Sequence, residues 1–108
     1  MWMVNPKGMC RRHLLGEHAE CHMFAGHLKR KRKINNYIAY NLLEPLSLKN
    51  RHDSLAKEML KRGYKHKSPL PEYDLSYLPK EHQNYQVDKV DSAKELHRRC
   101  DQCRKRTA

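Results

Sequence analysis

This sequence of 108 residues has no long hydrophobic run, and it contains only one Trp and one Phe. No apolar stretch approaches the roughly 20 residues that a membrane-spanning helix needs, so no transmembrane segment is predicted. The first nine residues, MWMVNPKGM, are too short and too interrupted by proline for a signal peptide. A hydrophobic fraction of 38% allows only a small core, and the six Tyr suit half-exposed positions. We therefore expect a cytoplasmic protein, in a bacterial host cell or in a cell infected by a phage or virus.

Acidic residues are scarce as well. Twelve Asp and Glu stand against 23 Lys and Arg, which gives a formal net charge of +11 and a pI near 9.7. Such a balance is typical of proteins that bind polyanions, with nucleic acid the first candidate and an anionic membrane surface the second. Lys29–Lys33 are five consecutive cations that repel one another, which favours an anionic partner over a merely solvated charge run.

Strand patterns and internal repeats are also missing, so the predicted fold is all-α. The length fits one domain, residues 1–108, of about three helices with a long wrapped Pro/Tyr-rich loop. Apolar periodicity predicts helices over Cys10–Lys29 and over Leu46–Arg62, the second ending at Gly63. A capping box over Ser92–Glu95 predicts a third helix to about Cys103. Three prolines exclude a long helix from the loop between the second and third predicted helices.

The first predicted helix places polar groups beside an apolar stripe. The stripe consists of Leu14, Cys21, Ala25 and Leu28. His13, Glu17 and Glu20 follow the neighbouring row at steps of four and three. A histidine and two carboxylates at the edge of an apolar face suggest a functional site, although a polar helix border is the simpler alternative.

In a cytoplasmic protein, the four cysteines are expected to be free thiols. Cys100 and Cys103 have the C-x-x-C spacing of metal or redox sites, but a structural zinc ion normally needs four ligands. On one continuous helix Cys10 and Cys21 would lie about 16 Å apart, so they cannot share an ion unless Cys10 precedes the helix.

Three blocks of the sequence resemble the phage-type pyrimidine-dimer DNA glycosylases, which are UV-damage endonucleases with abasic-site lyase activity. His13–Glu20 is similar to their HL-x-x-E-x-x-E segment. Arg51–Tyr64 is similar to their second helix, with E-x-L-K-R-G followed by an aromatic residue. Asp74–Glu81 is similar to their D-I-x-x-I-P-x-E loop, and the blocks follow in the family's order.

The resemblance implies a mechanism. In this family the N-terminal α-amine attacks the sugar C1′ of the damaged nucleotide and forms an imine, and a glutamate on the first helix serves as acid and base. By position these groups are the amine of Met1 and the carboxylate of Glu20, with His13 and Glu17 beside them in the predicted catalytic set. An α-amine titrates near about pH 8, so it is more available as a nucleophile than lysine at neutral pH. The resemblance implies no cofactor and no catalytic metal.

The sequence departs from the family pattern at Ala19 and Met23, where basic residues are expected. Phosphate contacts must then come from other cations. The candidates are Arg11, Arg12, Lys29, Arg30, Lys31, Arg32, Lys33 and Arg51. The expected partner is damaged double-stranded DNA, bound without a membrane and by a monomer.

Two other functions fit parts of the sequence. One is a non-catalytic basic nucleic-acid-binding module, stabilised by zinc through Cys100, Cys103 and His97 or other ligands. The other is a metal hydrolase that uses His13, Glu17, His18 and His22, although the H-E-x-x-H order is absent.

Overall fold

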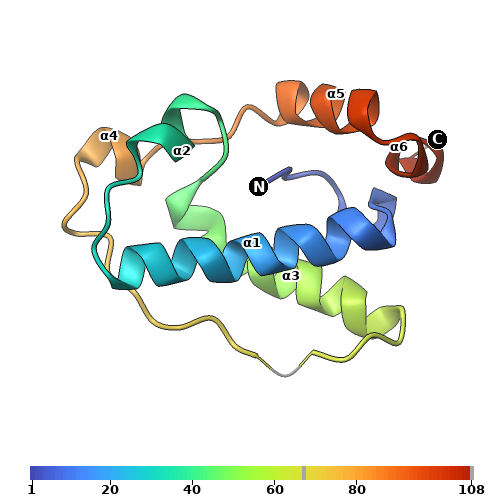
Figure 1. Ribbon diagram of the computed structural model, residues 1–108, viewed down its shortest axis with the longest axis horizontal. Helices are drawn as coiled ribbons and strands as arrows, with labels where there is room; N and C mark the ends of the chain where they lie inside the picture. Colours follow the sequence, from blue (N-terminus) through green and yellow to red (C-terminus); the bar gives the residue numbers. More distant parts are fainter. Residues whose placement is uncertain (67, 108) are drawn as a thin grey trace.

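The computed structural model describes residues 1–66 and 68–107, and all regular structure within them is helical (Figure 1). This confirms the all-α prediction. The longer helices are α1 (Arg11–Lys29), α3 (Leu48–Lys61) and α5 (Lys89–Arg99). Shorter elements are the 3₁₀ turns η1 (Pro6–Gly8) and η2 (Pro45–Ser47) and the helices α2 (Asn35–Ala39), α4 (Lys80–Gln83) and α6 (Asp101–Thr107). No helix in this part of the chain combines the length and apolarity needed to cross a bilayer.

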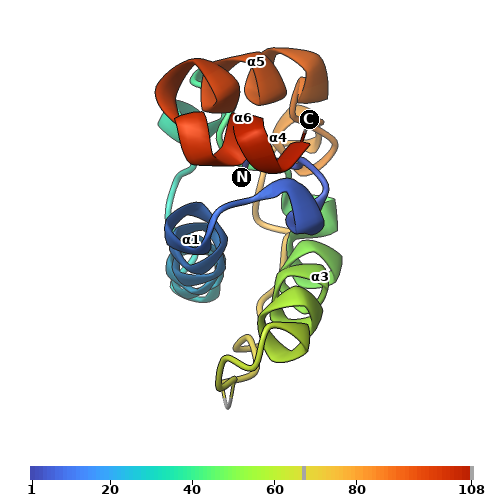
Figure 2. The ribbon, with the colours of Figure 1, turned by 90° about the vertical axis from the view of Figure 1, so that its right-hand side faces the viewer.

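Helices α1 and α3 pack side by side, and α5 and α6 lie across them as a second layer (Figure 2). The apolar stripe predicted on α1 is buried, as expected, and it meets the apolar face of α3. The shared core includes Leu14, Cys21, Ala25, Leu28, Leu48, Leu55 and Met59. Each large side chain buried here contributes on the order of 1.5–3 kcal/mol relative to exposure, so this contact dominates the small core.

Gly63 ends α3 as predicted. Its φ of 84° lies in the left-handed region, which glycine adopts without steric cost. The N–H of Gly63 donates to the carbonyl of Leu60 at 3.0 Å, and the N–H of Tyr64 donates to that of Met59 at 2.9 Å. These bonds satisfy carbonyls that the last turn would otherwise leave free.

The third predicted helix is wrong in two details. The side chain of Asp88, not that of Ser92, caps α5 by accepting from the N–H of Asp91, because the Ser92 hydroxyl donates to the Trp2 carbonyl at 2.6 Å. Glu95 binds arginines instead of closing a capping box. The helix also stops at Arg99, since Cys100 is extended (φ −136°, ψ 107°), and α6 starts a new direction at the next residue.

The predicted loop wraps around the helical core, held by partly buried anchors, and it contains the short helix α4, which the exclusion of a long helix allows. Leu78 is buried, and the Tyr77 hydroxyl donates to the Arg32 carbonyl at 2.6 Å. The loop thereby runs from α3 past the far end of α1 to α4, and from there to α5 (Figure 1).

The N-terminal arm runs between the two layers (Figures 1 and 2). Met1 and Met9 are both buried, at 4% and 0% exposure. The arm is bonded to α5 through Ser92 and to α1 through the Trp2 N–H, which donates to Glu17 Oε1 at 3.0 Å. The first residue of the chain is thus a core residue, and its amine lies inside the fold.

Candidate active site

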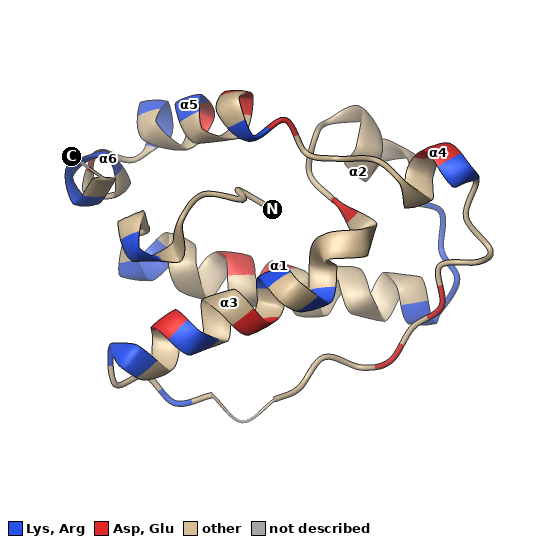
Figure 3. Ribbon diagram, turned by 180° about the vertical axis from the view of Figure 1, so that it is seen from behind, with Lys and Arg blue, Asp and Glu red and all other residues tan. Residues whose placement is uncertain are grey.

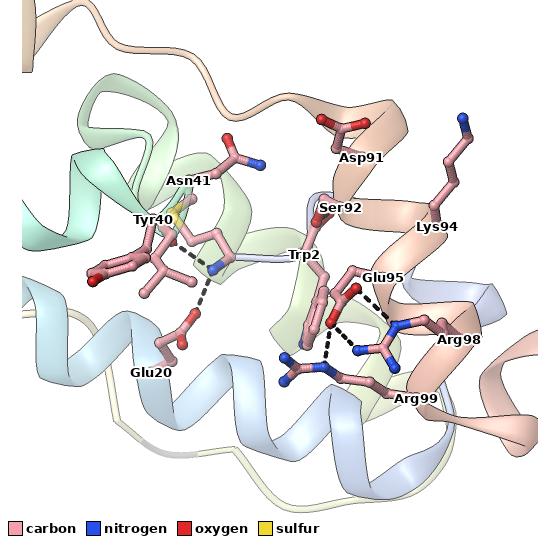
Figure 4. Close-up of a pocket in the computed structure, with 12 residues that line it drawn as sticks. Trp2, Glu20, Tyr40, Asn41, Asp91, Ser92, Lys94, Glu95, Arg98 and Arg99 are labelled. Carbon is pink, nitrogen blue, oxygen red and sulfur yellow. Dashed lines mark hydrogen bonds and ion pairs between the residues drawn. The ribbon is translucent and has the colours of Figure 1, made fainter.

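The N-terminal amine is held by two oxygens. It donates to Glu20 Oε1 at 2.5 Å and to the Leu42 carbonyl at 2.7 Å. The carboxylate comes from α1 and the carbonyl from the segment after α2, so two separate elements fix the nitrogen (Figure 4). The Glu20 side chain keeps 33% of its surface exposed, which leaves the pair open to a bound molecule.

The side chain of Met1 anchors this amine. It is fully buried, and its sulfur accepts from the N–H of Glu44 at 3.3 Å. Glu44 is itself buried, and its carboxylate accepts from the N–H of Val87 at 2.9 Å and from the Ser47 hydroxyl. Because the Met1 side chain is buried and its sulfur is bonded to this fixed segment, the amine has little freedom to leave Glu20.

Glu17, one turn earlier on α1, has a different environment. It is 2% exposed and accepts two hydrogen bonds from Arg51, from Nε at 2.5 Å and from Nη2 at 3.0 Å. Arg51 also donates to the Val4 carbonyl at 2.7 Å. A carboxylate this buried needs its cation, since an unpaired buried charge is strongly unfavourable. Glu17 and Arg51 therefore hold the arm in place and are not exposed to a ligand.

A pocket of about 640 Å³ opens beside the amine (Figure 4). Its walls come from the arm, from α1, from the segment after α2 and from α5. They are Met1, Trp2, Glu20, Tyr40, Asn41, Leu42, Asp91, Ser92, Lys94, Glu95, Arg98 and Arg99. Hydrogen bonds from Arg98 and Arg99 lower the pKa of Glu95 to about 2, so this carboxylate is ionised at neutral pH.

The α5 wall contributes cations that the sequence did not single out. Lys94, Arg98 and Arg99 line the pocket, where they can meet a phosphate group. Figure 4 shows Arg98 and Arg99 bonded to Glu95, and Lys94 extending away from the amine. The basic character of this segment was visible in the sequence, but its position opposite Glu20 depends on how α5 crosses the arm.

Most of the cations predicted to bind DNA are exposed. Arg11 and Arg12 lie at one end of α1, and Lys29–Lys33 lie at the other, about 27 Å away for a helix of this length (Figure 3). Arg11 also stacks over the Tyr64 ring at 5.3 Å. Arg51 is the exception: its side chain is 7% exposed and bound to Glu17, an arrangement that does not favour the predicted phosphate contact.

His13 does not lie with the amine and Glu20. Its Nδ1 is 3.3 Å from Cys10 Sγ and 3.6 Å from Cys103 Sγ, and its ring meets the edge of Trp2. His97, suggested above as a zinc ligand, instead contacts the Thr107 hydroxyl at 3.3 Å.

His18 and His22 lie together, but not with Glu17, which faces Arg51. They meet His52 of α3 and His66 of the following segment, with ring centroids 4.7–5.1 Å apart. Burial, followed by the three neighbouring imidazoles, lowers the pKa of His18 to about 4. The ligand set of the metal-hydrolase hypothesis is therefore not assembled.

Comparison with protein families gives one match. The family model for pyrimidine dimer DNA glycosylase matches residues 1–72, which include the arm, α1 and α3. Searches of curated proteins and of solved structures gave no match. The matched segment contains Met1 and Glu20, whereas α5 and α6 lie beyond it. Because the match spans two thirds of the 108 residues, the chain belongs to the pyrimidine dimer DNA glycosylase family, whose substrate is DNA.

Proposed function

We propose that this glycosylase excises a pyrimidine from UV-damaged duplex DNA and then cleaves the strand at the abasic site. The nucleophile is the α-amine of Met1, and Glu20 acts as acid and base. The observation that carries this proposal is the 2.5 Å contact between the amine and Glu20 Oε1 at the wall of an open pocket. Family membership supports the base-excision step.

The reaction begins when Glu20 takes a proton from the ammonium group of Met1. The free amine attacks C1′, and the bond between C1′ and the base nitrogen breaks, so the base leaves with the electron pair and gains a proton. The nitrogen loses its second proton, the C1′–O4′ bond opens with protonation of O4′, and a protonated imine joins Met1 to C1′. Glu20 then removes a C2′ proton, a C2′–C3′ double bond forms, and the C3′–O bond breaks, so that the downstream strand leaves with a 5′-phosphate.

The surroundings of the amine suit these steps. The Leu42 carbonyl orients the nitrogen, and positioning of a nucleophile is a large part of catalysis by covalent intermediates. Glu20 is partly exposed and can exchange protons with a substrate, whereas Glu17 is committed to Arg51. Glu17 is accordingly a positioning residue, and His13 takes no part in the step.

Cations on the α5 wall of the pocket and at the two ends of α1 support DNA binding. Extracting a nucleotide from the stack costs a few kcal/mol, least at a damaged site, and phosphate contacts can offset this cost. Arg11, Arg12 and Lys29–Lys33 are exposed along α1, and the α5 wall adds cations next to the amine. Binding should weaken steeply as salt is added.

Borohydride trapping tests the nucleophile. Reduction should capture a covalent adduct between residue 1 and an abasic duplex, and peptide mapping should locate it at the Met1 nitrogen. Glu20→Gln should lower strand cleavage by about 10²–10⁴-fold, the usual contribution of a general acid or base. Glu81→Gln is the matched control, because Glu81 is exposed on α4 and absent from the pocket.

Blocking the amine provides the decisive comparison. An N-terminal extension or acetylation of Met1 should abolish the adduct and the cleavage of both UV-irradiated and abasic duplexes. An adduct of full yield with the amine blocked would disprove the assignment to Met1. Cleavage of abasic DNA without release of the base from UV-irradiated DNA would separate the lyase activity from the glycosylase activity.

A further inference from the structure

Two clusters of metal-binding side chains lie outside the proposed active site. The first consists of Cys10, His13, Cys100 and Cys103, whose ligand atoms all lie within 4.8 Å of one another. Its members come from opposite ends of the chain, since Cys10 and Cys100 are 90 positions apart. We propose that these four residues bind one structural zinc ion.

The spacing of the ligand atoms fits a tetrahedral site. Zn–S bonds of about 2.3 Å and Zn–N bonds of about 2.0–2.1 Å place two sulfurs about 3.8 Å apart and a sulfur and a nitrogen about 3.5 Å apart. The distance from Cys10 Sγ to Cys100 Sγ is 3.8 Å. The distances from His13 Nδ1 to Cys10 Sγ and Cys103 Sγ are 3.3 and 3.6 Å. A disulfide between Cys10 and Cys100 would need a separation of about 2.05 Å and would leave the other two ligands unexplained.

Backbone groups around the sulfurs match a thiolate site. The N–H of Cys10 points at Cys103 Sγ, 3.3 Å away, and the N–H of Cys103 points at Cys100 Sγ, 3.5 Å away. Such donors stabilise the negative charge of metal-bound sulfur and orient the ligands. Three thiolates and a neutral imidazole give the zinc site a net charge of −1, and arginines adjoin the ligands in sequence at Arg11, Arg12 and Arg99.

The position of the site indicates its role. Cys10 caps the start of α1, and the extended backbone at Cys100 turns the chain so that Cys103 of α6 comes back to it. An ion here would fix α6, and with it α5, to the start of α1. This attachment would hold the α5 wall of the pocket opposite Glu20. Four protein ligands leave no open position for water, so the ion is structural and not catalytic.

The second cluster, His18, His22, His52 and His66, stands on separate observations. Nε2 of His52 and Nε2 of His66 are 3.3 Å apart, close to the roughly 3.3 Å expected for two nitrogens on a tetrahedral zinc ion. The Nε2 atoms of His18 and His22 are buried and have no hydrogen-bond partner among the described residues, which is unusual for polar atoms. The far nitrogen of His52, Nδ1, is 3.0 Å from Asp53 Oδ1, as in carboxylate–histidine–metal arrangements. We infer that these four histidines bind a second zinc ion, which joins α1 to α3.

Metal analysis of the untagged, full-length protein, produced in zinc-supplemented medium, tests both sites. The expected result is two zinc ions per chain. Cys103→Ser should lose one ion and His22→Gln the other. Cys21→Ser and His27→Gln are matched controls on α1, because neither residue belongs to a cluster, and both variants should keep two ions.

Cobalt substitution gives a second measurement, and the wild-type spectrum alone tests the cysteine ligands without relying on the folding of a variant. Tetrahedral Co²⁺ has intense visible bands, and cysteine ligands add sulfur-to-cobalt charge transfer in the near ultraviolet. The charge transfer should disappear in Cys103→Ser and persist in His22→Gln. A chelator should lower the thermal midpoint of the wild-type protein, and added zinc should restore it.

Each site has its own refuting result. Folded wild-type protein that contains no zinc and has four free thiols after zinc supplementation, or a Cys10–Cys100 disulfide, would overturn the cysteine–histidine site. A single zinc ion that persists in His22→Gln and is lost in Cys103→Ser would overturn the four-histidine site alone.

Discussion

The buried pair of Glu17 and Arg51 allows a quantitative test of how the arm is held. Arg51→Met removes the cation and leaves a carboxylate with 2% exposure, whose remaining donor is the Trp2 N–H. Breaking a buried ion pair in this way costs about 3–5 kcal/mol, because the other charge stays desolvated. Since domains of this size are stable by about 5–15 kcal/mol, the variant should be close to unfolding.

Urea denaturation at constant zinc concentration measures the effect. With an m-value of about 1.5 kcal/mol per molar urea, a loss of 3 kcal/mol moves the midpoint by about 2 M. Glu17→Gln leaves Arg51 buried with fewer acceptors, so it should also destabilise the protein. The double variant Glu17→Gln with Arg51→Met has no buried charge at this position and should recover part of the loss, which a double-mutant cycle quantifies.

Loss of the Glu17–Arg51 pair should also affect function, because the pair holds the arm that carries the proposed nucleophile. Trp2 follows the proposed nucleophile, and its N–H donates to a neutral amide oxygen instead of a carboxylate when Glu17 is replaced by Gln. The stable double variant should therefore fold but cleave abasic DNA more slowly than the wild-type protein. Exposed Glu81→Gln should change neither stability nor cleavage. A loss of under about 1 kcal/mol for Arg51→Met, together with purely additive effects in the double variant, would refute the argument that this pair holds the arm.

Four further predictions concern charge and thiol reactivity. The folded pKa of Glu95 is about 2, below the usual value for a glutamate. Its ionised form therefore favours the folded state above about pH 4.3, and this contribution to stability disappears as the pH falls toward 2. An NMR titration of the Glu95 side-chain carboxyl carbon measures the folded pKa. Glu95→Gln should release its two arginine partners and tighten DNA binding at low salt, and unchanged affinity would argue against a role for the α5 wall. Lys31→Ala should lower the slope of log K against log[salt] by about 0.9, whereas Lys57→Ala on α3 should not, in equilibrium titrations at several salt concentrations. Burial raises the pKa of Cys21 to about 12, so its thiol should react with iodoacetamide only after unfolding, which mass spectrometry can follow.

Local patterns in the sequence were enough for several parts of the fold. The row of Leu14, Cys21, Ala25 and Leu28 predicted which face of α1 is buried, because helical periodicity depends only on spacing. Gly63 predicted the end of α3 for a similarly local reason, since few other residues adopt its backbone conformation. The three similar blocks in the family's order indicated the family, which the family match confirms, and the His13–Glu20 block drew attention to Glu20 before its contacts were known.

Other features depended on which groups the fold brings together. The capping box and the uninterrupted third helix were locally reasonable, but Ser92 bonds to the arm and Cys100 turns the chain toward Cys10. Arg51 had the residue type of a phosphate ligand, yet its burial against Glu17 commits it to the core.

The sequence by itself therefore determined the two long helices α1 and α3, the basic charge, the family and the carboxylate on α1. Only the tertiary structure decided that the Met1 amine reaches Glu20, that the α5 cations face the pocket, and that Cys10 and His13 meet Cys100 and Cys103. The physical reason is that helix formation and capping depend on neighbours a few residues apart. Ion pairs and metal sites instead join groups up to 90 positions apart, and only the packing of the layers sets their distances.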